Sequence, residues 1–276
     1  MALFSRSSDL LLYGGAVVLL MALAFSQQER ADAPAAPPPV PGDTTAPGQS
    51  ATLGPAQGKH LPPQALEQAS GTAFSVSEAG VWITARHVVA GCRRAAVLVS
   101  PDRGVQARVV SSRGADVAVL ITQGGAPPLP LALSYPLDRG QIAFHPGYPR
   151  GQAGEAASRY LGAYFLPSAH RGGRAQPVQA WAEVGKTDGL KGSLAGLSGA
   201  PVLDSKGQVV GVTLAESPRR GRIYSAPRRA IRAALAAAGQ KPAVFAQGQP
   251  ITTDNYGRAA DGLRRSLSVA EVVCLD

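Results

Sequence analysis

Short apolar runs recur between residues 70 and 227, separated by glycine, proline and polar residues that favour turns. Such runs are typical of β-strands and are shorter than most helices. A Pro/Gly-rich stretch at 124–130 divides the runs into two groups. The pattern therefore predicts an all-β domain with strands at residues 72–75, 81–84, 95–100, 105–111 and 117–122, and then at 141–145, 160–165, 178–184, 201–203, 209–214 and 223–226.

One helix is predicted after the last of these strands. It spans residues 228–238, and Gly239 follows as a C-terminal stop. We expect the folded domain to cover residues 66–240 and residues 241–276 to form a C-terminal tail, which is too short to hold another domain with its own core.

The N-terminal part of the chain differs from the rest. Residues 10–25 form an uncharged apolar run after Arg6, shorter than the roughly 20 residues of a typical spanning helix. Ala24 and Ser26 are small residues of the kind that precede signal-peptidase cleavage. Residues 1–26 are thus either a cleaved signal peptide or a membrane anchor, and both alternatives place the domain outside the cytoplasm.

Residues 27–65 contain nine of the 23 prolines and few aromatic or β-branched residues. Such a segment buries too little apolar surface to fold, so we expect a disordered linker with polyproline II character. The net charge of +9 favours anionic lipids or acidic substrates, although a solvated basic surface is the simpler interpretation. No zinc spacing or aromatic-interleaved pattern indicates nucleic-acid binding.

Three residues stand in contexts that suit acyl transfer. His87 follows an apolar run, Asp116 opens another, and Ser198 lies in Gly-Leu-Ser-Gly-Ala-Pro. A serine hydroxyl becomes a good nucleophile when an imidazole takes its proton, and a carboxylate fixes the tautomer of that imidazole. Taken singly, the three could be a structural histidine, a strand-opening aspartate and a turn serine; together they predict a catalytic triad.

The three residues in this chain order, with the Pro-Val-Leu-Asp segment that starts at residue 201, resemble the trypsin-like serine proteases. Their short spacings and the Gly-Tyr-Pro at 147–149 are similar to the bacterial HtrA-type branch, and the resemblance covers roughly residues 70–239. It implies two six-stranded Greek-key β-barrels with the triad in the cleft between them. It also implies an oxyanion hole formed by the backbone N–H groups of Gly196 and Ser198.

The chain departs from the family pattern in several places. Leu197 stands where relatives mostly carry Asp or Asn, and Ala200 replaces a glycine. A polar contact that supports the oxyanion loop is therefore expected to be missing, while the triad stays intact. No PDZ module is expected after Gly239, because too few residues follow.

The resemblance also indicates a primary specificity pocket. It places Gly192 at the floor of this pocket and Thr213 in its wall. Because the floor position carries no carboxylate, we expect the substrate residue before the scissile bond, P1, to be small or apolar.

Cys92 and Cys274 are the only cysteines. An oxidising compartment favours a disulfide between them, but the sequence does not show whether their Cα atoms lie within reach, so two separate thiols remain an alternative. Neither cysteine has metal-site spacing, and neither metal nor cofactor is required by the chemistry. His145 and His170 are interpreted as loop histidines.

These patterns predict a serine endopeptidase of the cell envelope, periplasmic or secreted, that cleaves protein or peptide substrates. The alternative is a catalytically weak protease-fold scaffold, which the changes at Leu197 and Ala200 motivate. An envelope interaction protein that works through its spacer and basic face is a third interpretation. Inner-membrane association would run through residues 10–25, and nothing in the sequence indicates an oligomeric state.

Overall fold

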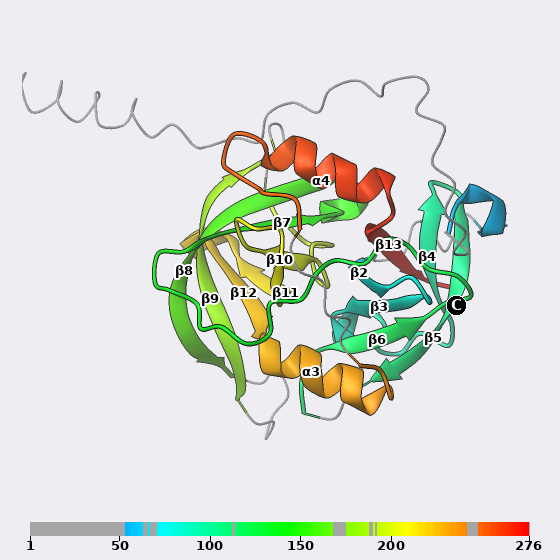
Figure 1. Cartoon of the computed structure of the whole chain (residues 1–276), viewed down its shortest axis with the longest axis horizontal. Helices are drawn as coiled ribbons and strands as arrows, with labels where there is room; N and C mark the ends of the chain where they lie inside the picture. The colour runs from blue at the N-terminus through cyan, green and yellow to red at the C-terminus, as the bar shows by residue number, and fades with distance from the viewer. Residues whose placement is uncertain are drawn as a thin grey trace, which may run out of the picture. The chain divides into compact units, whose positions relative to one another are not determined.

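Two antiparallel β-barrels make up most of the described structure (Figure 1). Each barrel has six strands and is closed, which confirms the expected all-β double barrel. The computed structural model describes residues 53–62, 66, 71–111, 114–167, 175–187, 190, 192–241 and 248–275.

The first barrel has the strand order β5-β4-β13-β2-β3-β6, and pairing of β5 with β6 closes it. A two-residue strand, β1, adds to the start of β5 from outside the ring. The bounds of these strands are β1 Lys59–His60, β2 Gly71–Ser77, β3 Val81–Thr84, β4 Ala95–Ser100, β5 Arg103–Ser111, β6 Ala118–Ile121 and β13 Val269–Cys274.

The second barrel has the order β10-β11-β12-β9-β8-β7, and pairing of β10 with β7 closes it. All six strands come from one continuous stretch of sequence. Their bounds are β7 Ile142–Gly147, β8 Gly154–Leu166, β9 Gln176–Lys186, β10 Pro201–Leu203, β11 Val209–Ser217 and β12 Arg222–Pro227.

Two helices pack against the barrels. The helix α3, Arg228–Ala237, confirms the predicted one and contacts strands of both barrels. The helix α4, Tyr256–Arg265, lies against β7, β8 and β13 on the opposite side of the view (Figure 1). Within the described ranges, no helix has the length and hydropathy needed to cross a bilayer. The apolar run at residues 10–25 lies outside them.

The domain boundary expected at residue 240 is wrong. Between residues 71 and 121 the first barrel has five strands, and β13 supplies the sixth by pairing with β2 on one side and β4 on the other. Five strands alone would leave two edges with unpaired N–H and C=O groups, which β13 removes. The segment expected to be a tail is therefore part of the fold.

The boundary expected at residue 66 is wrong as well. Leu53 is buried in the core of the first barrel, and its N–H donates to Gly125 O at 2.6 Å. Arg103 donates through Nε and Nη2 to Gly58 O at 3.0 and 2.6 Å. The last part of the proline-rich segment is thus packed on the barrel rather than disordered, because it buries an apolar side chain and satisfies backbone groups.

Each barrel has a buried tryptophan whose indole N–H is satisfied. Trp82 Nε1 donates to Thr122 Oγ1 at 3.0 Å in the first barrel, and Trp181 Nε1 donates to Ser225 Oγ at 2.9 Å in the second. Both residues are fully buried. A buried indole needs such an acceptor, since an unpaired N–H in a core costs about 1–3 kcal/mol.

Candidate functional site

His87 and Asp116 meet at one end of the first barrel. His87 lies in the single helical turn after β3, and Asp116 lies just before β6. Strands β3 and β6 are neighbours, with Thr84 paired to Ala118, so the antiparallel register brings the two residues together. His87 Nδ1 lies 2.7 Å from Asp116 Oδ2, and the His87 backbone N–H donates to Asp116 Oδ1 at 2.9 Å.

The protonation states of Asp116 and His87 suit a general base. Burial by itself raises the pKa of Asp116, but the hydrogen bonds and charge of His87 outweigh burial and hold the pKa below its usual range. An ionised carboxylate on Nδ1 favours the tautomer with the proton there, which leaves Nε2 as an acceptor. The His87 side chain is 46% exposed and that of Asp116 is 15% exposed, so the imidazole is open to solvent while the carboxylate is shielded.

Ser198 lies in the loop before β10, in the second barrel. Its hydroxyl donates to Leu214 O at 3.0 Å, and among the described residues it makes no hydrogen bond to His87. The loop nevertheless packs against the histidine segment. A β-carbon on Gly71 would lie 2.5 Å from the Val88 side chain and 3.0 Å from Ser198 O. The residue after His87 and the backbone of Ser198 therefore flank the same position.

Gly196 adopts a conformation that other residues rarely take. Its φ is +95°, and a β-carbon there would lie 2.5 Å from Tyr148 O and 2.9 Å from Arg150 N. Within the described part of the chain, neither Gly196 N–H nor Ser198 N–H has a hydrogen-bond acceptor. Two free N–H groups that flank Leu197 are what an oxyanion hole requires.

Leu197 and Ala200, the two departures from the family pattern, are both in the core. Leu197 is 1% exposed and packs with Leu194, Trp181 and Val202 inside the second barrel. An apolar side chain at this position is therefore stabilised by burial rather than by an ion pair. Polar support of the loop has to come from other residues.

A pocket of about 210 Å³ opens beside Ser198. Thr213, one of the two predicted pocket residues, lines it, whereas Gly192 does not. The pocket contains a carboxylate that the sequence reasoning missed, that of Glu216 near the end of β11, and its other lining residues are Leu194, Ala195, Leu197, Ser198, Ala215 and Ile223.

The Glu216 carboxylate is held in place by the loop that precedes Ser198. Its Oε1 accepts a hydrogen bond from Leu194 N–H at 2.6 Å and another from the Ser193 hydroxyl. Among the described residues, no cationic side chain pairs with it. The expectation of a small or apolar P1 residue did not take this carboxylate into account. It considered only the floor position, whereas the charge comes from a wall strand.

The histidines are placed as follows. His145, expected in a loop, is fully buried in β7, where its Nδ1 lies 2.9 Å from Thr213 Oγ1 and its Nε2 lies 2.7 Å from Ser158 Oγ. Burial lowers its pKa to about 3, so it is neutral and has no free nitrogen for catalysis. His170 lies outside the described residues.

Cys92 and Cys274 form a disulfide with a Cα–Cα distance of 5.4 Å. The bond joins the segment after the His87 turn to the end of β13. In the described residues, no group of three or more His, Cys, Asp or Glu side chains is arranged to hold a metal ion.

Comparisons with known proteins concern the family and the fold. A family model described as the trypsin-like peptidase domain matches residues 71–212, just over half of the chain. A search of curated proteins finds no match.

Several solved structures are similar. The active form of the Rv3671c protease from M. tuberculosis is 25% identical, with a TM-score of 0.54 over 71% of this chain and 82% of that one. Its inactive form is 26% identical, with a TM-score of 0.50 over 64% and 91%. The HtrA-type protease AlgW, solved with a decapeptide, is 20% identical, with a TM-score of 0.50 over 61% and 51%, and shows a similar fold.

Proposed function

The chain belongs to the trypsin-like peptidase family, and from this premise we propose that it is a serine endopeptidase with Ser198 as nucleophile, His87 as base and Asp116 as orienting carboxylate. The observation that carries the proposal is the 2.7 Å contact between His87 Nδ1 and Asp116 Oδ2. It leaves Nε2 of an exposed imidazole free to accept a proton, beside a loop whose serine hydroxyl is the available nucleophile.

The reaction begins when Ser198 turns from Leu214 O toward His87. This step is a rotation of the Ser198 side chain, and it is supported by the Ser198 backbone, which lies beside the residue after His87. His87 Nε2 takes the hydroxyl proton as Oγ attacks the peptide carbonyl, and the N–H groups of Gly196 and Ser198 stabilise the oxyanion. The proton then passes from His87 to the leaving amine, and water hydrolyses the acyl-enzyme by the same route.

The test is labelling of the full chain with a fluorophosphonate probe. We expect labelling of the wild-type protein, none of Ser198→Ala, and strong loss in His87→Ala. Ser205→Ala, at an exposed position in the turn after β10, is the matched control and should label as the wild type does. Absence of labelling in a folded wild-type chain would contradict the proposal.

One observation favours the alternative, a catalytically weak scaffold of the same fold. The Ser198 hydroxyl is hydrogen-bonded to Leu214 O rather than to His87. An enzyme held in this arrangement would bind a peptide but label slowly. A wild-type chain that binds a peptide substrate tightly while labelling no faster than His87→Ala would support the scaffold.

The pocket chemistry supports a basic P1 residue, in place of the small or apolar one first expected. Glu216 puts a fixed carboxylate among otherwise apolar or hydroxyl side chains. An arginine or lysine side chain would pair with this charge, whereas an apolar one would leave it desolvated. Peptide substrates that differ only by arginine or citrulline at P1 test this. The wild type should prefer arginine, and Glu216→Gln should remove most of the preference; cleavage of leucine best by both proteins would contradict it.

The domain is proposed to act outside the cytoplasm, in the periplasm or after secretion. The Cys92–Cys274 disulfide supports this location, because such bonds persist in oxidising compartments. The apolar run at residues 10–25 supports it as well. Fractionation of cells that express the full chain, with alkylation of free thiols, tests both: the protein should be envelope-associated or secreted with its cysteines blocked. A cytoplasmic protein with two reactive thiols would contradict the proposal.

A further inference from the structure

Leu197 anchors the Gly196–Ser198 loop by burial, so polar support of the loop has to come from another residue. Thr72, the second residue of β2, lies within hydrogen-bonding distance of this loop. It belongs to the first barrel, whereas the loop belongs to the second, and it is completely buried. A fully buried threonine needs partners for its hydroxyl, since an unsatisfied one costs about 1–3 kcal/mol.

Thr72 makes two hydrogen bonds to the loop. Its Oγ1 donates to Gly196 O at 2.9 Å, and its backbone N–H donates to Ser198 O at 2.8 Å. One residue therefore contacts the backbone on both sides of Leu197.

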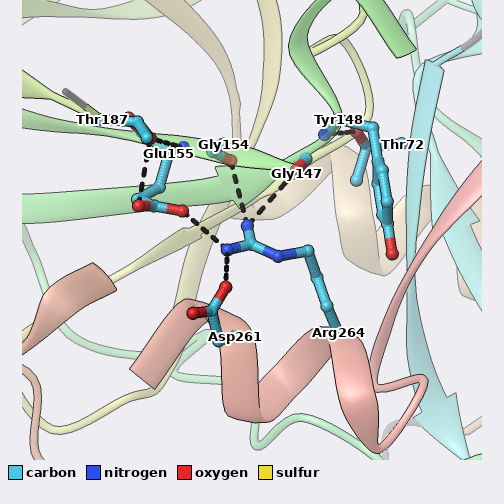
Figure 2. A network of polar contacts seen from close by, with 8 residues as sticks. All are labelled: Thr72, Gly147, Tyr148, Gly154, Glu155, Thr187, Asp261 and Arg264. Carbon is cyan, nitrogen blue, oxygen red and sulfur yellow. Dashed lines mark hydrogen bonds and ion pairs between the residues drawn. The ribbon is translucent and has the colours of Figure 1, made fainter. Parts of the chain in front are cut away.

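The direction of the hydroxyl bond is fixed by a third partner. The Tyr148 backbone N–H donates to Thr72 Oγ1 at 3.0 Å, as Figure 2 shows. An amide N–H can only donate, so the single hydroxyl proton of Thr72 is left for Gly196 O. The side chain thus acts as an oriented donor.

The tyrosine segment is itself supported by the helix α4. Arg264 Nη1 donates to Gly154 O at 3.1 Å and lies 3.4 Å from Gly147 O, next to Tyr148 (Figure 2). Its Nη2 pairs with Glu155 Oε2 at 2.8 Å and with Asp261. The C-terminal segment therefore supports the loop that presents Tyr148 to Thr72.

These bonds set the peptide planes of the oxyanion loop. A peptide unit is planar, so a bond to its oxygen also orients its N–H. Arg150 N–H holds Ala195 O and thereby the plane that carries Gly196 N–H. Thr72 holds the next plane through Gly196 O, opposite the bond from Leu197 N–H to Leu194 O at 2.9 Å. This second plane carries Leu197 N–H rather than a donor of the oxyanion hole, but it restrains the Gly196 dihedrals that lie between the two planes. Without the Thr72 hydroxyl, only the Leu197 N–H bond to Leu194 O holds it.

We propose that Thr72 is a positioning residue of the oxyanion hole, whose hydroxyl replaces the polar support that the family resemblance places at residue 197. This inference rests on the proposed peptidase function. It predicts that loss of the hydroxyl impairs transition-state stabilisation and leaves substrate binding intact.

The variants for the test are Thr72→Val, which keeps the shape and removes the hydroxyl, and Thr72→Ser, which keeps the hydroxyl. The matched control is Thr122→Val. Thr122 is also a buried threonine of the first barrel with a donor and an acceptor partner, Trp82 and Gly124, but it does not contact the loop. All variants are made in the full chain.

The kinetic readout is kcat and KM per active site titrated, with inhibition by a peptide aldehyde of the same sequence. For Thr72→Val we expect kcat to fall about 10- to 100-fold, below the 10²- to 10³-fold loss for removal of a hole donor itself. KM should stay within about twofold of the wild-type value. The affinity for the aldehyde inhibitor should fall in parallel with kcat. Thr72→Ser should restore most of kcat, and Thr122→Val should match the wild type. Two results would overturn the proposal: a kcat of Thr72→Val equal to that of the wild type, or a kcat that falls as far in Thr72→Ser as in Thr72→Val.

A second measurement does not depend on activity. In a Ser198→Ala background, Thr72→Val should speed amide hydrogen exchange in the peptide that covers residues 192–200, with no change in β9. Unchanged exchange there would overturn the positioning role even if the wild type is an active protease. Thr72→Cys, whose thiol is a weak donor, replaces the valine variant if the latter does not fold, and its kcat should lie below that of Thr72→Ser.

Discussion

The two six-stranded barrels close in different ways. The second barrel closes from consecutive residues, because its six strands run from β7 to β12 without interruption. The first barrel closes only when β13 arrives from the other end of the chain and pairs between β2 and β4. Its closure is therefore a long-range contact, which carries a larger entropic cost than local pairing.

The two barrels also differ in the interactions that stabilise them. The first barrel has a covalent bond at the strand that closes it, because Cys274 at the end of β13 is joined to Cys92. The second barrel has an apolar core that also contains hydrogen-bonded polar groups, such as His145 with Thr213 and Ser158, and both cysteines lie outside it. The C-terminal segment is linked to both barrels, since Arg264 of α4 bonds to the β7–β8 connection of the second.

The largest expected effect comes from removal of β13, the strand that closes the first barrel. A chain that ends at Ser266 lacks β13 and exposes the edges of β2 and β4. We expect fast amide exchange throughout the first barrel, aggregation, and loss of fluorophosphonate labelling. A chain that ends at Cys274 keeps every pairing of β13 and is the control. A stable, labelled protein without β13 would show that closure of the first barrel is dispensable.

The next effect concerns the link between α4 and the second barrel. Arg264→Met leaves the Glu155 carboxylate buried without its cation, which typically costs about 3–5 kcal/mol of unfolding free energy. Burial already raises the pKa of Glu155 while Arg264 opposes the rise, so without Arg264 the deficit should shrink as pH falls and the carboxyl protonates. Urea unfolding at pH 5 and pH 8 measures both. The exposed Arg265→Met is the control and should change stability little.

Removal of the disulfide should have a smaller effect, which is confined to the first barrel. Replacing both Cys92 and Cys274 by serine should lower the unfolding free energy by about 2–4 kcal/mol, because the unfolded chain is no longer cross-linked. Dithiothreitol should lower the stability of the wild type similarly and leave the double variant unchanged. Faster amide exchange should be found in β13 and β4 and not in β9. A uniform effect in both barrels would contradict the assignment of the bond to first-barrel closure.

The last effect is absent at neutral pH, appears only in acid and belongs to the second barrel. Burial lowers the pKa of His145 to about 3 in the folded state, from its ordinary value of 6.5. The unfolded chain therefore binds the proton first, and His145 should remove about 1.4 kcal/mol of stability for each pH unit below about 6. The stability that comes from keeping His145 neutral is fully present above pH 6.5, and it is lost as the pH falls toward about 3. His145→Asn should have a shallower dependence in urea unfolding between pH 4 and 7; equal slopes would contradict it.

Much of the site could be predicted because its residues carry local signals. His87 and Asp116 each adjoin a short apolar strand, and Ser198 lies between glycines before another, so strand and turn chemistry mark all three. The missed residues have no such signal. Glu216 continues β11 and enters the pocket only because that strand passes behind the Ser198 loop.

The sequence by itself determined the all-β class, the two groups of strands, the helix α3 and the three candidate catalytic residues, since these depend on periodicity and turn residues that act over short distances. Only the tertiary structure decided that β13 completes the first barrel, that Leu53 joins its core and that Thr72 reaches the Ser198 loop. The physical reason is that strand pairing and buried hydrogen bonds select partners by proximity in space, and many segments of a chain carry equivalent donors, acceptors and apolar side chains.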